Sequence, residues 1–125
     1  MDPYIGENLA FFQVDSQNSK QYLIKSTTAN TLTFAPTISD YLNIIKNKDG
    51  TYSLTQGTSF VSFPVGQPAQ LTTDPKIASK IIFFSTERDN YFCLFDYTLK
   101  KYFSPYNKQL IQKDICQSSD QLSIK

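Results

Sequence analysis

A hydrophobic pattern that recurs every forty residues is the feature that most limits how this chain can fold. Aromatic or aliphatic residues occupy matching places in three successive stretches, and no stretch carries enough apolar residues to form a core alone. Repetition at a period of roughly 20–50 residues is typical of repeat proteins. The matching sets are Phe12, Tyr52 and Phe92; Val14, Leu54 and Leu94; Leu23, Phe63 and Phe103; and Ile44, Phe84 and Ile124.

Within each stretch the apolar residues alternate with polar ones, which predicts β-strands rather than helices. Phe12-Gln13-Val14 shows this alternation, and Tyr22-Leu23-Ile24 follows after a polar turn. The segment 35–40 is too short and too rich in Pro, Ser and Asp to form a stable helix. The pattern therefore predicts three units of four short strands each, over residues 7–47, 48–87 and 88–125.

Strands of this kind must bury their apolar faces and protect their edges. An extended solenoid is a poor solution because polar end caps are missing, whereas closure of the strands removes exposed edges. We therefore expect one closed domain, with the first three matching sets filling its centre.

Two kinds of segment resemble known families. Lys20–Ile24 and Lys100–Ser104 look like the Gly-Lys-Tyr-Leu-Ser strand of the fascin-like and agglutinin-type β-trefoils, and Gly66–Leu71 is similar to the second-hairpin segment of the ricin-type lectins. The ricin-type Gln-x-Trp signature is missing, since Gln121-Leu122-Ser123 stands in its place and the chain has no Trp. The resemblance implies an all-β fold, a single β-trefoil over residues 1–125 with pseudo-threefold symmetry.

The residue types that most catalytic and metal sites need are missing. The chain has no histidine, which excludes Ser-His-Asp and Cys-His arrangements, and its two cysteines cannot form a structural zinc site. The four glycines do not have the spacing of a phosphate-binding loop. Paired-carboxylate hydrolysis by Asp96, Asp114 or Asp120 has no support in their spacing. We expect a binding protein without enzymatic activity, cofactor or metal.

Charge and hydropathy restrict the partners and the location. The formal net charge is +1, and Arg88 is the only arginine, so there is no basic stripe for nucleic acid. The longest buried apolar run, residues 81–84, is far too short to span a membrane. The amino end does not read as a signal peptide, and there is no Asn-x-Ser/Thr site. With Cys93 and Cys116 interpreted as free thiols, we expect a cytoplasmic protein, although a mature secreted form would look the same.

The resemblance implies a lectin-like module, and the third unit has the residue types that bind sugars. Sugar recognition would use an aromatic ring together with carboxylate and amide groups. Asp96 and Tyr97 occupy the first loop of this unit, and Tyr106, Asn107 and Gln109 occupy its hairpin. We expect one sugar site there and a glycan or glycoprotein as partner. Asp and Asn are equally common in turns for purely structural reasons, so that interpretation stays open.

The alternative is a protein-interaction module, as in the actin-binding, cytokine and protease-inhibitor trefoils. Phe60-Val61 stands where the other units have Lys20-Gln21 and Lys100-Lys101, and Phe83 replaces Asn43 and Ser123. If these side chains point outward, they form an apolar patch that a protein partner or a second copy of the chain could cover. A local shift of register that turns Phe60 or Phe83 inward explains the same residues without an interface.

Overall fold

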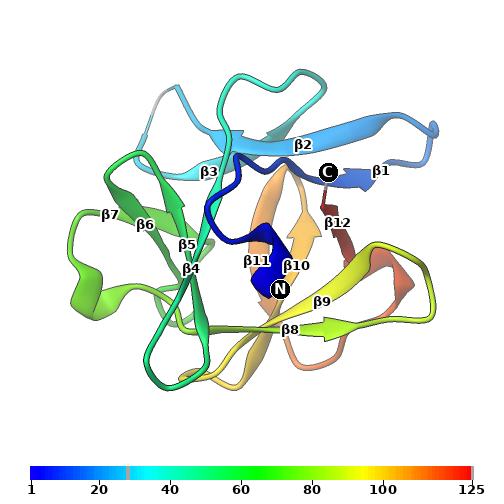
Figure 1. The fold of residues 1–125 in the computed structure, drawn as a ribbon. Helices are drawn as coiled ribbons and strands as arrows, with labels where there is room; N and C mark the ends of the chain where they lie inside the picture. Colours follow the sequence, from blue (N-terminus) through cyan, green and yellow to red (C-terminus); the bar gives the residue numbers. More distant parts are fainter. Residues whose placement is uncertain (28, 125) are drawn as a thin grey trace.

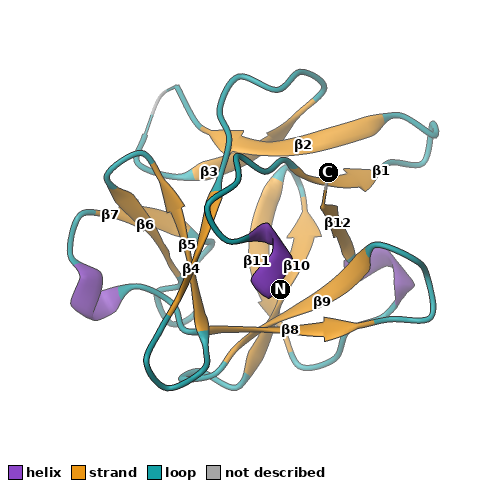
Figure 2. Ribbon diagram, viewed as in Figure 1, coloured by secondary structure: helices purple, strands orange, loops and turns teal. Residues whose placement is uncertain are grey.

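The computed structural model describes residues 1–27 and 29–124 and shows an all-β protein (Figure 2). Twelve strands and three short 3₁₀ turns make up its regular structure within these ranges, and none of the helical turns is long enough to span a membrane. The strands are β1 (Phe11–Val14), β2 (Lys20–Lys25), β3 (Leu32–Ala35), β4 (Asn43–Lys46), β5 (Tyr52–Gln56), β6 (Ser59–Ser62), β7 (Gln70–Thr72), β8 (Ile81–Ser85), β9 (Tyr91–Asp96), β10 (Lys101–Tyr106), β11 (Gln109–Lys113) and β12 (Leu122–Ile124). The turns are η1 (Asp2–Tyr4), η2 (Pro75–Ile77) and η3 (Ser118–Asp120).

All the strands are hydrogen-bonded into one sheet, and every pairing between them is antiparallel. The longest path runs β3-β2-β1-β12-β9-β8-β5-β6-β7, while β4 pairs with β5, and β10 pairs with both β9 and β11. In Figure 1 the β2–β3 hairpin lies at the top, β6–β7 at the left, and β10–β11 behind the N-terminal turn η1. The pairing of β1 with β12 places the first strand beside the last.

The core comes from alternating residues of these strands. Leu54, Leu94 and Phe103 are completely buried, as the sequence pattern predicted. Three cross-strand pairs place apolar residues opposite one another: Phe11 with Ile124, Leu54 with Ile44, and Leu94 with Phe83. Three further pairs do the same: Leu9 with Leu42, Tyr52 with Ile81, and Phe92 with Leu122. Each set of three pairs therefore repeats one kind of apolar contact at three places in the sheet.

The forty-residue frame selected the wrong residues in two strands, β1 and β8. Val14 is 40% exposed, and the fully buried residue of β1 is Phe11. Twelve positions separate Phe11 from Leu23, whereas nine separate Leu54 from Phe63 and Leu94 from Phe103. The first β-hairpin is therefore longer than its counterparts, and a fixed spacing of forty residues selects the wrong side chain.

The second error lies in β8, where Phe84 is 45% exposed and Ile81 is fully buried. Phe63 and Leu71 are one residue closer in sequence than Leu23 and Leu32. A shift of one residue moves every side chain of a strand to the opposite face of the sheet. Phe83 consequently points toward the core, where its ring contacts those of Phe11, Tyr52 and Phe92 at centroid distances of 6.3, 5.8 and 6.3 Å.

The interpretation of both cysteines as free thiols was also wrong. Cys93 in β9 and Cys116 in the segment before η3 form a disulfide, with their Cα atoms 6.2 Å apart. Disulfides form and persist in oxidising compartments and are rare in the cytosol. This bond overturns the prediction of a cytoplasmic protein, which depended on free thiols.

Candidate functional site

The residues predicted for a sugar site in the third unit lie at opposite ends of β10. Asp96 pairs with Lys101, the first residue of that strand, and Gln109 pairs with Tyr106, the last. Five steps along a strand correspond to roughly 17 Å. The structure therefore does not bring the two predicted loops together into one site.

Asp96 has a structural task in the first of these loops. Its side chain is only 2% exposed, and Oδ1 accepts hydrogen bonds from the backbone N–H groups of Thr98 and Leu99, each at 3.0 Å. This is the turn role that Asp commonly plays. Tyr97 is exposed, but Nζ of Lys100 lies 3.5 Å from the centroid of its ring and covers one face.

The second loop is a tight two-residue hairpin. Asn107 and Lys108 adopt positive φ angles of 52° and 64°, which is typical of the turns that best match the strand twist. The carbonyl of Lys108 accepts hydrogen bonds from the backbone N–H of Phe34 and the hydroxyl of Thr33, which attach the hairpin to β3. Tyr106 and Gln109 flank this turn and are both exposed. The positive φ angle of this turn is therefore sufficient to explain Asn107.

The apolar patch predicted on the outer face of the second unit does not exist as such. Val61 is fully buried, and Phe83 packs against the core. Phe60, in β6, is only partly exposed. The inward register that the sequence left open therefore applies to Phe83, and the outward orientation expected for Val61 was wrong.

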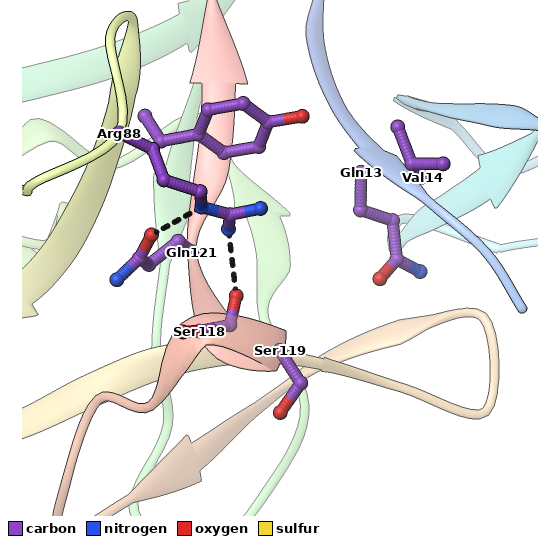
Figure 3. Close-up of a pocket in the computed structure, with 7 residues that line it drawn as sticks. Gln13, Val14, Arg88, Ser118, Ser119 and Gln121 are labelled. Atoms are coloured by element: carbon purple, nitrogen blue, oxygen red, sulfur yellow. Dashed lines mark hydrogen bonds between the residues drawn. The ribbon is translucent and has the colours of Figure 1, made fainter. Parts of the chain in front are cut away.

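A polar hollow instead lies where β1, β9 and η3 approach one another. We call it the Arg88 hollow; it has a volume of about 270 Å³ and is lined by Gln13, Val14, Arg88, Tyr91, Ser118, Ser119 and Gln121 (Figure 3). These residues come from three separate segments of the chain. Together they provide amide groups, hydroxyls and a guanidinium, with Val14 and Tyr91 as less polar parts of the wall.

The side chain of Arg88 is fixed in this hollow by three contacts. Nε donates a hydrogen bond to Oε1 of Gln121 at 3.0 Å, and a terminal nitrogen donates to the carbonyl of Ser118 at 2.8 Å (Figure 3). The guanidinium also lies over the ring of Tyr91, 3.8 Å from its centroid. A cation over an aromatic face is attracted by the ring quadrupole. Arg88 is therefore held in one orientation although it lies at the surface.

The loop that carries Arg88 is closed by its own hydrogen bonds. The hydroxyl of Thr86 donates to the carbonyl of Tyr91 at 2.9 Å and accepts from the backbone N–H of Arg88 at 3.2 Å. The N–H of Tyr91 in turn donates to the carbonyl of Arg88. Such local side-chain bonds stabilise tight turns, so the loop places the guanidinium and the ring of Tyr91 side by side.

The other wall, η3, is fixed by the buried carboxylate of Asp120. Burial opposes ionisation of this group, but hydrogen bonds from Ser104, from the backbone N–H of Gln117 and from Lys113 outweigh that effect and hold the pKa of Asp120 below its ordinary value. The disulfide of Cys116 restrains the residues just before η3. The Ser118 carbonyl that accepts from Arg88 therefore lies on a well-supported segment.

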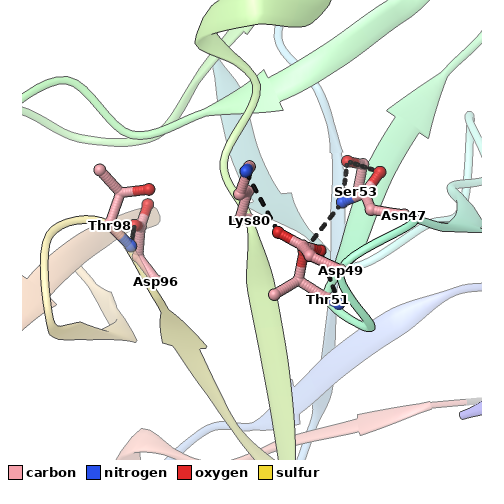
Figure 4. A network of polar contacts seen from close by, with 7 residues as sticks. All are labelled: Asn47, Asp49, Thr51, Ser53, Lys80, Asp96 and Thr98. Carbon is pink, nitrogen blue, oxygen red and sulfur yellow. Dashed lines mark hydrogen bonds and ion pairs between the residues drawn. The ribbon is translucent and has the colours of Figure 1, made fainter.

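A second polar cluster lies in the turn between β4 and β5 (Figure 4). Asp49 accepts hydrogen bonds from the backbone and hydroxyl of Thr51 and forms an ion pair with Lys80 at 3.1 Å. The hydrogen bonds from Thr51 and the contact with Lys80 lower the pKa of Asp49 to about 2. Asn47 bonds to Thr51 and Ser53 in the same turn. Because these groups satisfy one another, the cluster explains the turn without a ligand.

Sequence reasoning missed the Arg88 hollow, although one signal was available. Arg88 is the only arginine in the chain, and we used it only to exclude nucleic acid. Its neighbours in space are 33 and 75 positions away along the chain at Gln121 and Gln13, so no local motif could reveal them. No cluster of three or more His, Cys, Asp or Glu side chains that could bind a metal occurs among the described residues.

Neither a protein-family model nor a curated protein sequence matches this chain. Solved structures do match. The structure of SeviL bound to asialo-GM1 saccharide superimposes with a TM-score of 0.76 over 94% of this chain and 96% of that one, at 11% identity. The crystal structure of the lysenin pore has a TM-score of 0.65 at 8% identity; the match covers 97% of this chain but 46% of the lysenin chain, about half of its length. At such identities the likeness establishes a shared β fold.

Proposed function

We propose that this chain is a carbohydrate-binding β-trefoil without enzymatic activity and that its saccharide site is the Arg88 hollow. The all-β fold, its likeness to SeviL bound to asialo-GM1 saccharide, and the polar lining of the hollow support this proposal. A shared fold alone does not establish a shared function, so the site carries the argument.

The trefoil assignment draws support from the strand pairings. Leu42, Ile81 and Leu122 each lie opposite an apolar residue of a neighbouring strand, in three places along the chain. Ile44, Phe83 and Ile124, each two positions further on, repeat this arrangement. Three units related by a threefold axis would produce this set of contacts, and the unequal loop lengths explain why the sequence spacing departs from forty residues.

The observation that carries the proposed function is the fixed guanidinium of Arg88 facing neutral polar groups across the hollow. Gln13 contributes an amide from β1, and Ser118 and Ser119 contribute hydroxyls from η3 (Figure 3). Amides and hydroxyls can each donate and accept hydrogen bonds, as sugar hydroxyls also do. Binding sites combine a few fixed polar groups with apolar surface, which Val14 and Tyr91 provide here.

We propose a binding role rather than a catalytic one for a chemical reason. Catalysis of glycoside hydrolysis uses a pair of carboxyl groups beside the scissile bond. The lining of the Arg88 hollow contains amides, hydroxyls and a guanidinium but no carboxyl group. The hollow therefore lacks the carboxyl pair that this chemistry uses.

A glycan array with the labelled protein tests this proposal, using Gln13→Ala as the site variant and Tyr106→Ala as its control. We expect saturable binding to a defined glycan class. Loss of the Gln13 amide removes hydrogen bonds worth about 1 kcal/mol and should weaken binding by roughly two- to tenfold. Tyr106→Ala alters an exposed side chain of the β10–β11 hairpin and should leave binding unchanged.

Two results would contradict the proposal in different ways. A blank array for a correctly folded protein would refute carbohydrate binding. Binding that is lost in Tyr106→Ala and retained in Gln13→Ala would instead place the saccharide at the hairpin that the sequence pattern indicated. Thermal unfolding of each variant must accompany the array, so that a loss of binding is not confused with a loss of structure.

A further inference from the structure

We infer that the Arg88 hollow binds an acidic saccharide, one that carries a carboxylate or a sulfate group. This inference rests on the proposed function and specifies the class of ligand for the same site. It follows from the charge, the free donors and the fixed position of the single arginine.

Arg88 forms no ion pair among the described residues. In the part of the chain that the structure describes, four lysines form ion pairs with carboxylates. No carboxylate of this part, however, lies within 4.0 Å of the Arg88 guanidinium. Asp120, the nearest acid along η3, already accepts hydrogen bonds from Ser104, Lys113 and the backbone of Gln117. The hollow itself contains no Asp or Glu, while Glu87 lines an adjoining hollow on which Arg88 also borders. The lining of the Arg88 hollow therefore contains one cation and no acid.

Some N–H donors of the Arg88 guanidinium are not used in the hydrogen bonds that hold it in place. Arginine carries five N–H groups, and only two hydrogen bonds, to Gln121 and to the carbonyl of Ser118, hold it in place. Figure 3 shows the other terminal nitrogen directed across the hollow, towards the side on which Gln13 lies. Guanidinium groups bind carboxylate and sulfate-like oxygens through parallel hydrogen bonds, and such charge-assisted bonds are stronger than neutral ones.

The position of Arg88 is set before any ligand arrives. Stacking on Tyr91 and the two hydrogen bonds remove much of the rotamer freedom that an exposed arginine would otherwise lose on binding. Ser119 of η3 lines the same hollow, is exposed and offers a hydroxyl to the ligand. A rigid guanidinium next to hydroxyl and amide groups suits an acid group attached to a sugar ring better than a free inorganic ion, which would leave the amides unused.

The test compares matched glycans that differ only in the acid group. The array should contain sialylated, uronic-acid and sulfated saccharides, each beside its neutral parent, together with competition by free inorganic sulfate. The variants are Arg88→Gln, which removes the charge, and Ser119→Asp, which places a carboxylate in the hollow without altering Arg88. Lys48→Gln, an exposed lysine in the β4–β5 turn, is the control for an equal change in net charge.

We expect an acidic glycan to bind at least tenfold more tightly than its neutral parent, and we expect Arg88→Gln and Ser119→Asp to abolish that preference. Lys48→Gln should retain it. Comparison of binding to the sialylated and uronic-acid saccharides with binding to the sulfated saccharides will identify which acid group is recognised. Free sulfate should compete only weakly, since it lacks the sugar contacts.

Three results would overturn the inference. Equal binding of acidic and neutral partners, unaffected by Ser119→Asp, would refute the acid preference and leave the carbohydrate-binding proposal intact. A preference that persists in Arg88→Gln would place the acid group elsewhere. A blank array for both classes would refute the proposed function and this inference with it. Ser119→Asp keeps the test valid if Arg88→Gln does not fold.

Discussion

Lys113 donates hydrogen bonds to both carboxylate oxygens of Asp120, at 3.0 and 3.1 Å, and so connects the end of β11 to η3. Asp120 is 3% exposed, whereas about a third of the Lys113 side chain remains in contact with solvent. The same carboxylate accepts from Ser104 in β10 and from the backbone of Gln117. One buried acid thus supports the wall of the hollow to which Arg88 is attached.

Asp120→Asn should destabilise the protein by about 1–3 kcal/mol, because the amide accepts these hydrogen bonds less strongly and leaves Lys113 without an ionic partner. Urea unfolding measures the difference. Asp114→Asn is the control: Asp114 forms an exposed ion pair with Lys101, and such pairs contribute at most about 1 kcal/mol. Equal losses in the two variants would show that the buried contacts of Asp120 have no special weight.

The stability of the protein should fall in acid. The folded-state pKa of Asp120 lies below its ordinary value of 3.8, and that of Asp49 is about 2. A carboxyl group with a depressed folded pKa stabilises the fold above its unfolded pKa and loses this contribution as the pH falls through the folded pKa. The midpoints of urea unfolding should be similar at pH 7 and pH 4 and clearly lower at pH 2.5.

Asp120→Asn should reduce this acid sensitivity, since one of the carboxyl groups with a lowered folded-state pKa is then absent. A profile in which the variant and the original protein lose equal stability between pH 4 and 2.5 would assign the acid effect to Asp49 and other carboxylates rather than to Asp120.

Phe11→Ala should cost about 3–5 kcal/mol, because Phe11 is completely buried in the core. Val14→Ala should cost less than about 1 kcal/mol, because Val14 is 40% exposed. The forty-residue frame makes the reverse prediction, with Val14 in the core. Chemical denaturation of both variants therefore distinguishes the register of β1 in the structure from the register that sequence spacing predicts.

Removal of the disulfide should lower stability by about 3 kcal/mol, the loop-closure value for a separation of 23 residues. For a domain of this size that corresponds to a fall in Tm of roughly 10 °C. The measurement is thermal unfolding with and without reductant. The double variant Cys93→Ser with Cys116→Ser should unfold at the lower temperature in both conditions. If the Tm of the original protein is the same with and without reductant, the cysteines are not bonded to each other.

The amino-acid sequence determined the character of the fold. Alternation of apolar and polar residues predicted strands without helices, and the burial of Leu23, Leu54, Leu94 and Phe103 follows directly from it. Hydrophobic periodicity succeeds here because a side chain that alternates on a strand must face either the core or the solvent. It failed at Val14 and Phe84, where differences in loop length shift the register, since a repeat frame carries no information about insertions.

Only the tertiary structure decided which residues from distant parts of the chain lie side by side. The pairing of Cys93 with Cys116, the inward turn of Val61 and Phe83, and the separation of Asp96 from Tyr106 along β10 all depend on how strands from distant parts of the chain pack. The Arg88 hollow is of the same kind, because β1, the loop before β9 and η3 meet only after folding. Sequence supplies the residue types, but contacts between distant segments arise from the packing of the whole core.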